Sequence, residues 1–173
     1  MTIAEPPFSD PVRLNHIGLG VKRTLTPEAA VRERIAASLD LLALDRFQAD
    51  MDLVPTAGGW RLSGRVSADV VQACSVTLEP LPETVNETFS IELAEADENM
   101  PADVELTLDD DAPDYIEGGA VDLGVYAVEQ LALALDPFPR KPGAVFEAPL
   151  DEAEPSPFAV LRKLSDKADG QGG

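Results

Sequence analysis

His16 and Cys74 are the two strongest candidates for general-base or nucleophilic chemistry, and each is the single residue of its type among 173. A catalytic thiol needs a base within hydrogen-bond reach, and only one imidazole exists to provide it. His16 has no second histidine or cysteine near it in the sequence, and Cys74 ends an alternating segment where a small buried thiol is the usual case. We interpret His16 as a surface or turn residue and Cys74 as a core residue, and we predict that the chain is not an enzyme.

A dense acidic run could bind a hard cation through its carboxylate oxygens. Asp109, Asp110 and Asp111 are consecutive, and Asp103, Glu105 and Asp114 lie nearby. The run lacks the spacing of an EF-hand, because a loop beginning at Asp109 has no glycine at its sixth position and no glutamate at its twelfth. We favour a solvated loop and predict neither a metal ligand nor a cofactor. The open alternative is a metal-ion-binding or metal-dependent hydrolytic protein that uses this acidic cluster.

Three arginines are candidates for contacting RNA or a partner protein. Arg61 and Arg65 share one face of an alternating segment, and Arg46 precedes the segment that is predicted to pair with it. Together they form a candidate basic patch, for which ordinary surface charge is the simpler explanation.

A proline-rich turn is the segment best suited to protein contact. It follows an apolar helical pattern and contains the first basic residues after a long interval without any. Prolines reduce the entropy lost on binding, and an aromatic residue beside an arginine is a common interface anchor. We predict a partner contact by the turn residues Asp136, Pro137, Phe138, Pro139, Arg140 and Lys141.

Alternating apolar and polar residues predict the strands that position these groups. The segments Phe47–Leu53 and Trp60–Val70 alternate with period two on either side of the turn at Pro55–Gly59, which predicts a hairpin with one buried face. A third long strand is predicted over Val85–Leu93. Weaker patterns predict short strands at Val12–Leu14 and Leu19–Leu25.

Two helices are predicted to cover this sheet. Thr26 followed by Pro27 is a typical helix start, and a helix near residues 27–41 would bury one stripe formed by Val31, Ile35, Leu39 and Leu42. Asp122 is a good N-cap for an apolar helix near residues 122–135. We therefore predict an α+β fold, with a mainly antiparallel sheet of three or more long strands packed by two principal helices.

The charge of the chain is distributed very unevenly. The formal net charge is −19, and no Lys or Arg occurs between Arg65 and Arg140. Such a section repels phosphate backbones, so direct nucleic-acid binding through it is disfavoured, whereas a basic protein partner fits it. The sequence also has no apolar segment long enough to span a bilayer and no signal peptide, so we expect a cytoplasmic protein without membrane contact.

The order of motifs resembles the bacterial YceD family, which is described as the large ribosomal RNA subunit accumulation protein. The resemblance rests on Val66–Cys74, Thr77–Pro80, Val121–Gly124, Glu129–Arg140 and Pro157–Leu161, and it spans about residues 60 to 164. It implies a non-enzymatic factor that supports 23S ribosomal RNA accumulation and large-subunit biogenesis, with a basic ribosomal or assembly protein as partner.

The resemblance also marks one departure. Many relatives have Cys-x-x-Cys where this chain has Cys74 and Thr77, and another Cys or His after the proline-rich turn. Neither residue type occurs between Arg140 and Phe146. A metal site that these residues could form in those relatives therefore lacks its ligands here. For the whole chain we expect a single YceD-like domain over residues 1–165, with an acidic loop near 95–120, followed by a flexible tail at 166–173.

Overall fold

The structure, a computed structural model, describes residues 5–96, 112–116 and 118–145. Within these residues the main sheet has five strands in the order β2-β3-β4-β5-β6. Their bounds are Val21–Leu25, Ala43–Thr56, Gly59–Ala73, Pro80–Glu95 and Asp114–Ile116. All neighbours are antiparallel except β5 and β6, which are parallel. A second sheet pairs β1, Pro11–Arg13, with β7, Ala120–Asp122.

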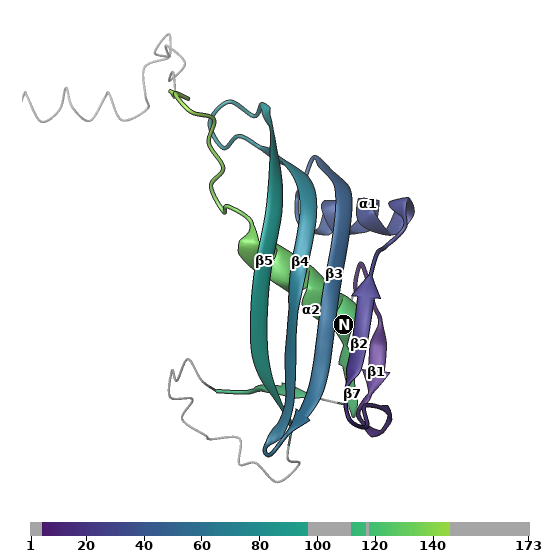
Figure 1. The fold of residues 1–173 in the computed structure, drawn as a ribbon. Coiled ribbons are helices and arrows are strands. Elements are labelled where there is room, and N and C mark those ends of the chain that lie inside the picture. The colour runs from purple at the N-terminus through teal and green to yellow at the C-terminus, as the bar shows by residue number, and fades with distance from the viewer. Residues whose placement is uncertain (1–4, 97–111, 117, 146–173) are drawn as a thin grey trace, which may run out of the picture.

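Two α-helices accompany the sheet in the described part of the chain. The helix α1 spans Ala29–Ser38 and lies beside β3, while α2 spans Leu123–Ala134 and crosses one face of the sheet behind β3, β4 and β5 (Figure 1). A short 3-10 helix, η1, covers Leu14–His16. The predicted α+β class, with long antiparallel strands and two principal helices, is confirmed.

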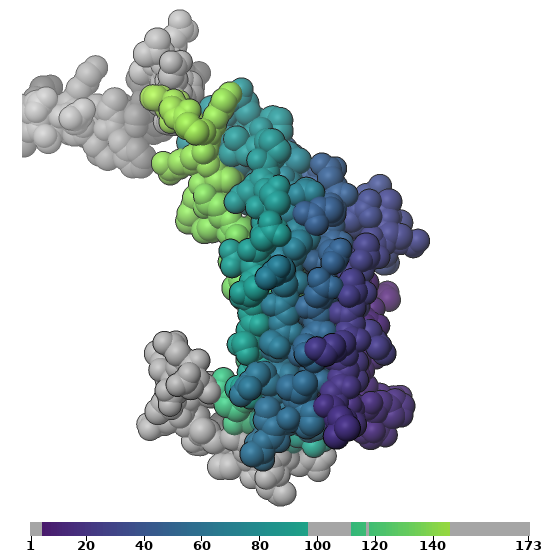
Figure 2. All heavy atoms as spheres, viewed as in Figure 1, coloured from purple at the N-terminus to yellow at the C-terminus, as the bar shows by residue number. Residues whose placement is uncertain are grey.

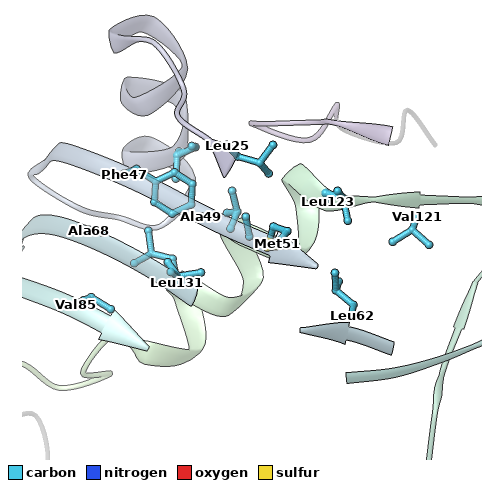
Figure 3. Close-up of a cluster of buried hydrophobic side chains, with 14 of the residues drawn as sticks. Leu25, Phe47, Ala49, Met51, Leu62, Ala68, Val85, Val121, Leu123 and Leu131 are labelled. Atoms are coloured by element: carbon cyan, nitrogen blue, oxygen red, sulfur yellow. The ribbon is translucent and has the colours of Figure 1, made fainter. Parts of the chain in front are cut away.

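The core fills the space between α2 and the sheet. Fully buried residues of α2 (Leu123, Leu131) face Phe47 of β3 and Leu62 and Ala68 of β4 (Figure 3). The apolar positions of both hairpin strands lie opposite one another, as in the pair of Leu53 and Leu62, which explains why period-two alternation predicted this hairpin correctly.

The start of α1 differs from its prediction. Glu28, rather than Thr26, is the N-cap residue, and the first helical hydrogen bonds run from the amides of Val31 and Arg32 to the Glu28 carbonyl. The Pro27 carbonyl instead accepts from the Arg32 side chain at 2.9 Å, which keeps Pro27 outside the helix.

The end of α1 also differs, because the helix stops at Ser38. Asp40 then adopts a φ of 53° and turns the chain toward β3. Leu42 bonds through its amide to the Val71 carbonyl and is 57% exposed, so it does not join the buried stripe.

Three strand predictions need adjustment. The structure places β1 at Pro11–Arg13 and β2 at Val21–Leu25, each shorter or shifted from its predicted bounds. It also places β6 inside the region near 95–120 that was predicted as an acidic loop. Strand β6 has three residues and pairs in parallel with a strand that is distant in the sequence. A pattern of that length is too short to recognise in a sequence.

Candidate partner-binding site

Two segments far apart in the sequence meet at one end of the sheet, and we call this contact the junction. It consists of the β4–β5 connection, residues Cys74–Glu79, and the proline-rich turn Asp136–Lys141 that follows α2. The Ser75 amide donates to the Pro139 carbonyl at 2.8 Å, and the Gln72 side-chain amide donates to the Asp136 carbonyl at 3.0 Å. These bonds fix the turn against the sheet.

Cys74 lies at the centre of the junction with no solvent exposure. Its sulfur accepts hydrogen bonds from the backbone amides of Lys141 at 3.4 Å and Thr77 at 3.5 Å. These donors, led by the Lys141 amide, lower the pKa of the Cys74 thiol to about 6 because they stabilise the thiolate. The prediction that Cys74 is buried is confirmed, and the structure adds that its sulfur joins the two segments.

A polar network occupies the place where the resemblance implies further cysteine or histidine ligands in relatives. The Lys141 ammonium lies 3.0 Å from a Glu79 carboxylate oxygen, and the Thr77 hydroxyl lies 3.1 Å from the same oxygen. These two contacts hold the pKa of Glu79 below its usual value. A structural zinc site requires four nitrogen, sulfur or oxygen ligands, and the hydroxyl and ammonium groups here do not fit one.

The junction presents apolar side chains to solvent. Phe138 is 70% exposed and Leu78 is 76% exposed. Leu78 has a φ of 58°, a left-handed conformation that is costly for a residue with a branched side chain and that often marks functional segments. The sequence pointed to Phe138 as a candidate contact but not to Leu78, because no local pattern indicates a positive φ at a leucine.

A hollow of about 440 Å³ lies between the turn and the sheet. Leu135, Pro137 and Pro139 line it on the side of the turn, and Gln72 and Ser75 line it on the side of the sheet. Within the described residues, the buried Gln72 Oε1 atom accepts no hydrogen bond. The junction therefore combines apolar contact, a concave surface and a free acceptor.

The three predicted arginines lie on the solvent-facing side of the sheet, opposite α2, but the register spaces them along the hairpin at the levels of Asp69, Arg65 and Arg61 of β4, so they do not form one cluster. Arg46 forms a salt bridge with Asp69 at 2.8 Å, and Arg61 forms one with Glu92. Arg65 is paired across β3 and β4 with Asp50, whose pKa is lowered first by hydrogen bonds from Thr24 and Gln48 and to a smaller extent by the charge of Arg65. Each cation therefore has an acidic neighbour, so this face has little net positive charge to attract phosphate.

The remaining candidates form no catalytic or metal-binding group in the part of the chain that the structure describes. His16 is exposed in η1. Among these residues no cluster of three or more His, Cys, Asp or Glu side chains could hold a metal ion. Of the acidic cluster, Asp114 lies in β6, and Asp103, Glu105 and Asp109–Asp111 lie outside the described residues. No helix in the described residues is long and apolar enough to cross a membrane.

Fold and site together define an α+β domain in which a cysteine-centred contact joins the end of a long hairpin to the turn after a buried helix. The family model described as large ribosomal RNA subunit accumulation protein YceD matches residues 62–165. This match covers more than half of the chain, so the chain belongs to the YceD family, which confirms the resemblance seen in its motifs. No curated protein and no solved structure matches.

The family match includes both segments of the junction. It begins at residue 62, near the start of β4, and continues past the β4–β5 connection and the proline-rich turn. The description of the family implies a role in the accumulation of ribosomal RNA of the large subunit.

Proposed function

We propose that this protein is a non-enzymatic cytoplasmic factor that supports 23S ribosomal RNA accumulation by binding a basic ribosomal or assembly protein at the junction. The observation that carries the proposal is the turn held against the β4–β5 connection, in which Phe138 is exposed between two prolines that line a hollow, while the connection itself exposes Leu78. A turn that is already held by hydrogen bonds loses little conformational entropy when it binds.

The charge along β5, the strand that begins at the junction, favours a basic partner. Strand β5 begins directly after Glu79 and carries four exposed glutamates, Glu83, Glu87, Glu92 and Glu95. The chain as a whole has a net charge of −19. A field of this sign attracts a cationic protein and repels RNA, so it accelerates encounter with the former.

Recovery of partners from cell lysate tests the proposal. The full chain with an affinity tag is compared with the double variant Phe138→Ala and Leu78→Ala, and bound proteins are quantified by mass spectrometry. We expect proteins of the large subunit or its assembly intermediates with the unmodified chain. Their recovery should fall about tenfold or more in the variant, because buried aromatic anchors contribute about 2 kcal/mol or more to an interface.

A matched control is Leu19→Ala, which removes a side chain that is 99% exposed in the β1–β2 connection. This variant should recover the same proteins as the unmodified chain. If the junction variant recovered the same proteins as the unmodified chain, the contact would have to lie outside the junction. Recovery of ribosomal RNA without any stoichiometric protein, lost when Arg46, Arg61 and Arg65 are replaced, would support direct RNA binding instead.

A further inference from the structure

A second hollow lies along the edge of β5, and we call it the edge groove. Strand β6 pairs only with Leu93–Glu95, so within the described residues the rest of this edge has no strand partner. The groove has a volume of about 780 Å³ and runs between β5 and the C-terminal end of α2. In Figure 2 the teal surface of β5 runs down one flank of the molecule, below the segment that follows α2.

The lining of the edge groove is both apolar and acidic. Phe89 and Ile91 of β5 and Leu133 of α2 provide the apolar part, and Leu133 is 78% exposed. Asp114 provides a carboxylate, and Glu92 provides a second one that already forms a salt bridge with Arg61. A surface of this kind suits a segment with apolar side chains on one face and cations beside them.

One carboxylate pair beside the groove has no cation among the described residues. Asp114 of β6 and Glu129 of α2 form none of the ion pairs found there. Burial, followed by the charge of Asp114, raises the pKa of Glu129. The same two carboxylates add to the effect of burial in raising the pKa of Tyr126. A bound cation would relieve this repulsion.

We propose that the edge groove binds the chain's own segment Phe158–Leu164. Outside the described residues the chain contains only three cations, Arg162, Lys163 and Lys167, and all three lie in this segment or just after it. The segment therefore supplies the charge that the groove lacks. This inference does not rest on the proposed function.

The apolar residues of the segment have the spacing that the groove requires. Phe158, Leu161 and Leu164 recur every third residue, which places them on one side of a helical turn. Arg162 and Lys163 then fall beside that stripe, where they can approach Asp114 and Glu129. The spacing alone does not indicate what the segment contacts, because the groove is formed only when β5 and α2 meet.

The connection is long enough for the segment to reach the groove. Residues 146–157 separate the last described residue from Phe158, and a chain of that length spans at most about 40 Å. Lys141 contacts Glu79 at the start of β5. Phe89 is ten positions further along that strand, about 33 Å at the rise of an extended chain.

The family match points the same way. It runs to residue 165 and therefore includes β5, α2 and the segment up to Leu164 within one domain. A segment that belongs to the family domain is more simply explained by docking on that domain than by an unattached tail.

Disulfide trapping in the full chain tests the proposal. Leu133→Cys is combined with Leu161→Cys, and disulfide formation under mild oxidation is followed on non-reducing gels, with the linked peptides identified by mass spectrometry. The control pairs Leu161→Cys with Leu19→Cys, another highly exposed position. Cys74 stays in place because it is buried.

We expect the bond between positions 133 and 161 to form about tenfold faster or more than the control bond, and within monomers. Equal rates would overturn the proposal. A bond that forms only in dimers would assign the groove to a second copy, and that result would also overturn it.

Charge exchange provides a second test, which measures how the rate of disulfide trapping depends on the charges of the segment and of the groove. Replacing Arg162 and Lys163 by Glu should slow trapping severalfold, and adding Asp114→Lys with Glu129→Lys should restore the rate. Failure of the exchange to restore trapping would contradict the assigned charge contacts. Far-ultraviolet circular dichroism of each variant verifies that it is folded.

Discussion

At the scale of single residues, two positions show how contacts between distant segments constrain the chain. Gly64 of β4 has no room for a Cβ atom, which would lie 2.4 Å from the Asp50 carbonyl oxygen and 3.1 Å from the Phe89 ring. Cys74 was recognisable as a buried thiol from its place after an alternating strand. Its hydrogen bond from Lys141, 67 residues later, was not recognisable, because nothing local in the sequence brings those segments together.

Substitution of Gly64 should therefore destabilise the fold. We expect Gly64→Ala to lower the free energy of unfolding by about 1–3 kcal/mol, because it overpacks the space that Phe89 and Met51 fill. Urea unfolding measures the change. Gly58→Ala is the control, since a Cβ atom there meets nothing within 4 Å, and it should change stability by less than about 0.5 kcal/mol. Equal stability of the two variants would refute the packing argument.

Cys74 should make the stability of the protein depend on pH between about 6 and 9. The folded thiol has a pKa of about 6, below the ordinary value of 9.0, so the thiolate favours the folded state. This contribution is fully present above pH 9 and is lost as the pH falls through 6. The stability difference between the unmodified chain and Cys74→Ser should therefore shrink as the pH is lowered over that window.

Denaturant unfolding of both proteins at several pH values measures that difference. Ultraviolet absorbance of the thiolate in the folded chain gives the pKa directly, with Cys74→Ser as the blank. A thiol that titrates near 9 in the folded chain would show that the amides of Lys141 and Thr77 do not stabilise the thiolate.

At the scale of elements, the start of α2 was the feature that the sequence predicted best, and it also contacts a segment that is distant in the sequence. The Asp122 side chain accepts from the amides of Gly124 at 3.0 Å and Val125 at 3.2 Å, as expected of an N-cap. It also accepts from the Asp10 amide at 2.8 Å and from the Ser9 hydroxyl. A Cβ atom on Gly124 would lie 2.8 Å from the backbone of Ser9 and Asp10, which explains the glycine in the Val121–Gly124 motif.

Asp122 should therefore contribute more to stability than an ordinary cap. Asp122→Ala should cost about 2 kcal/mol or more, because an N-cap alone contributes about 1 kcal/mol and the contacts to Ser9 and Asp10 are lost as well. Asp122→Asn retains the capping oxygen and should cost less. Urea unfolding of both variants measures the loss of stability. An Asp122→Ala variant as stable as the unmodified chain would contradict the role of Asp122 as both helix cap and contact for Ser9 and Asp10.

The contrast with α1 shows where local signals fail. Thr26 and Pro27 are a typical helix start. The Arg32 guanidinium, however, donates hydrogen bonds to the Pro27 carbonyl and, at 3.3 Å, to the Leu44 carbonyl of β3. That tertiary contact displaces the helix start to Glu28. Local capping chemistry thus predicted α2, where the long-range contacts reinforce the cap, and failed for α1, where a long-range contact competes with it.

At the scale of the whole molecule, the sequence predicted the layers and the uneven charge but not where segments meet. Alternation predicted the hairpin of β3 and β4, and helical spacing predicted α2 behind it. The junction depends on the turn after α2 reaching the β4–β5 connection, and the edge groove depends on α2 ending beside β5 (Figure 1). Neither contact has a local pattern, so the sequence could not predict where these two surfaces form.

Charged residues are distributed differently over the open face of the sheet and over the flank formed by β5. On the open face of the sheet, cations and acids are interleaved, so pairs such as Arg46 with Asp69 cancel. Exposed pairs of this kind contribute little to stability. Along β5 the acids outnumber the cations, and this flank connects the junction with the edge groove. The net charge of the protein is negative, and a field of that sign attracts cations and repels phosphate.

The most direct test of the central claim is the ratio of 23S to 16S ribosomal RNA after depletion of the protein from its own cells. The account predicts a lower ratio, restored by the unmodified chain and by Leu19→Ala but not by the variant that lacks Phe138 and Leu78 at the junction. A ratio that stays unchanged on depletion would contradict the proposed role in large-subunit biogenesis.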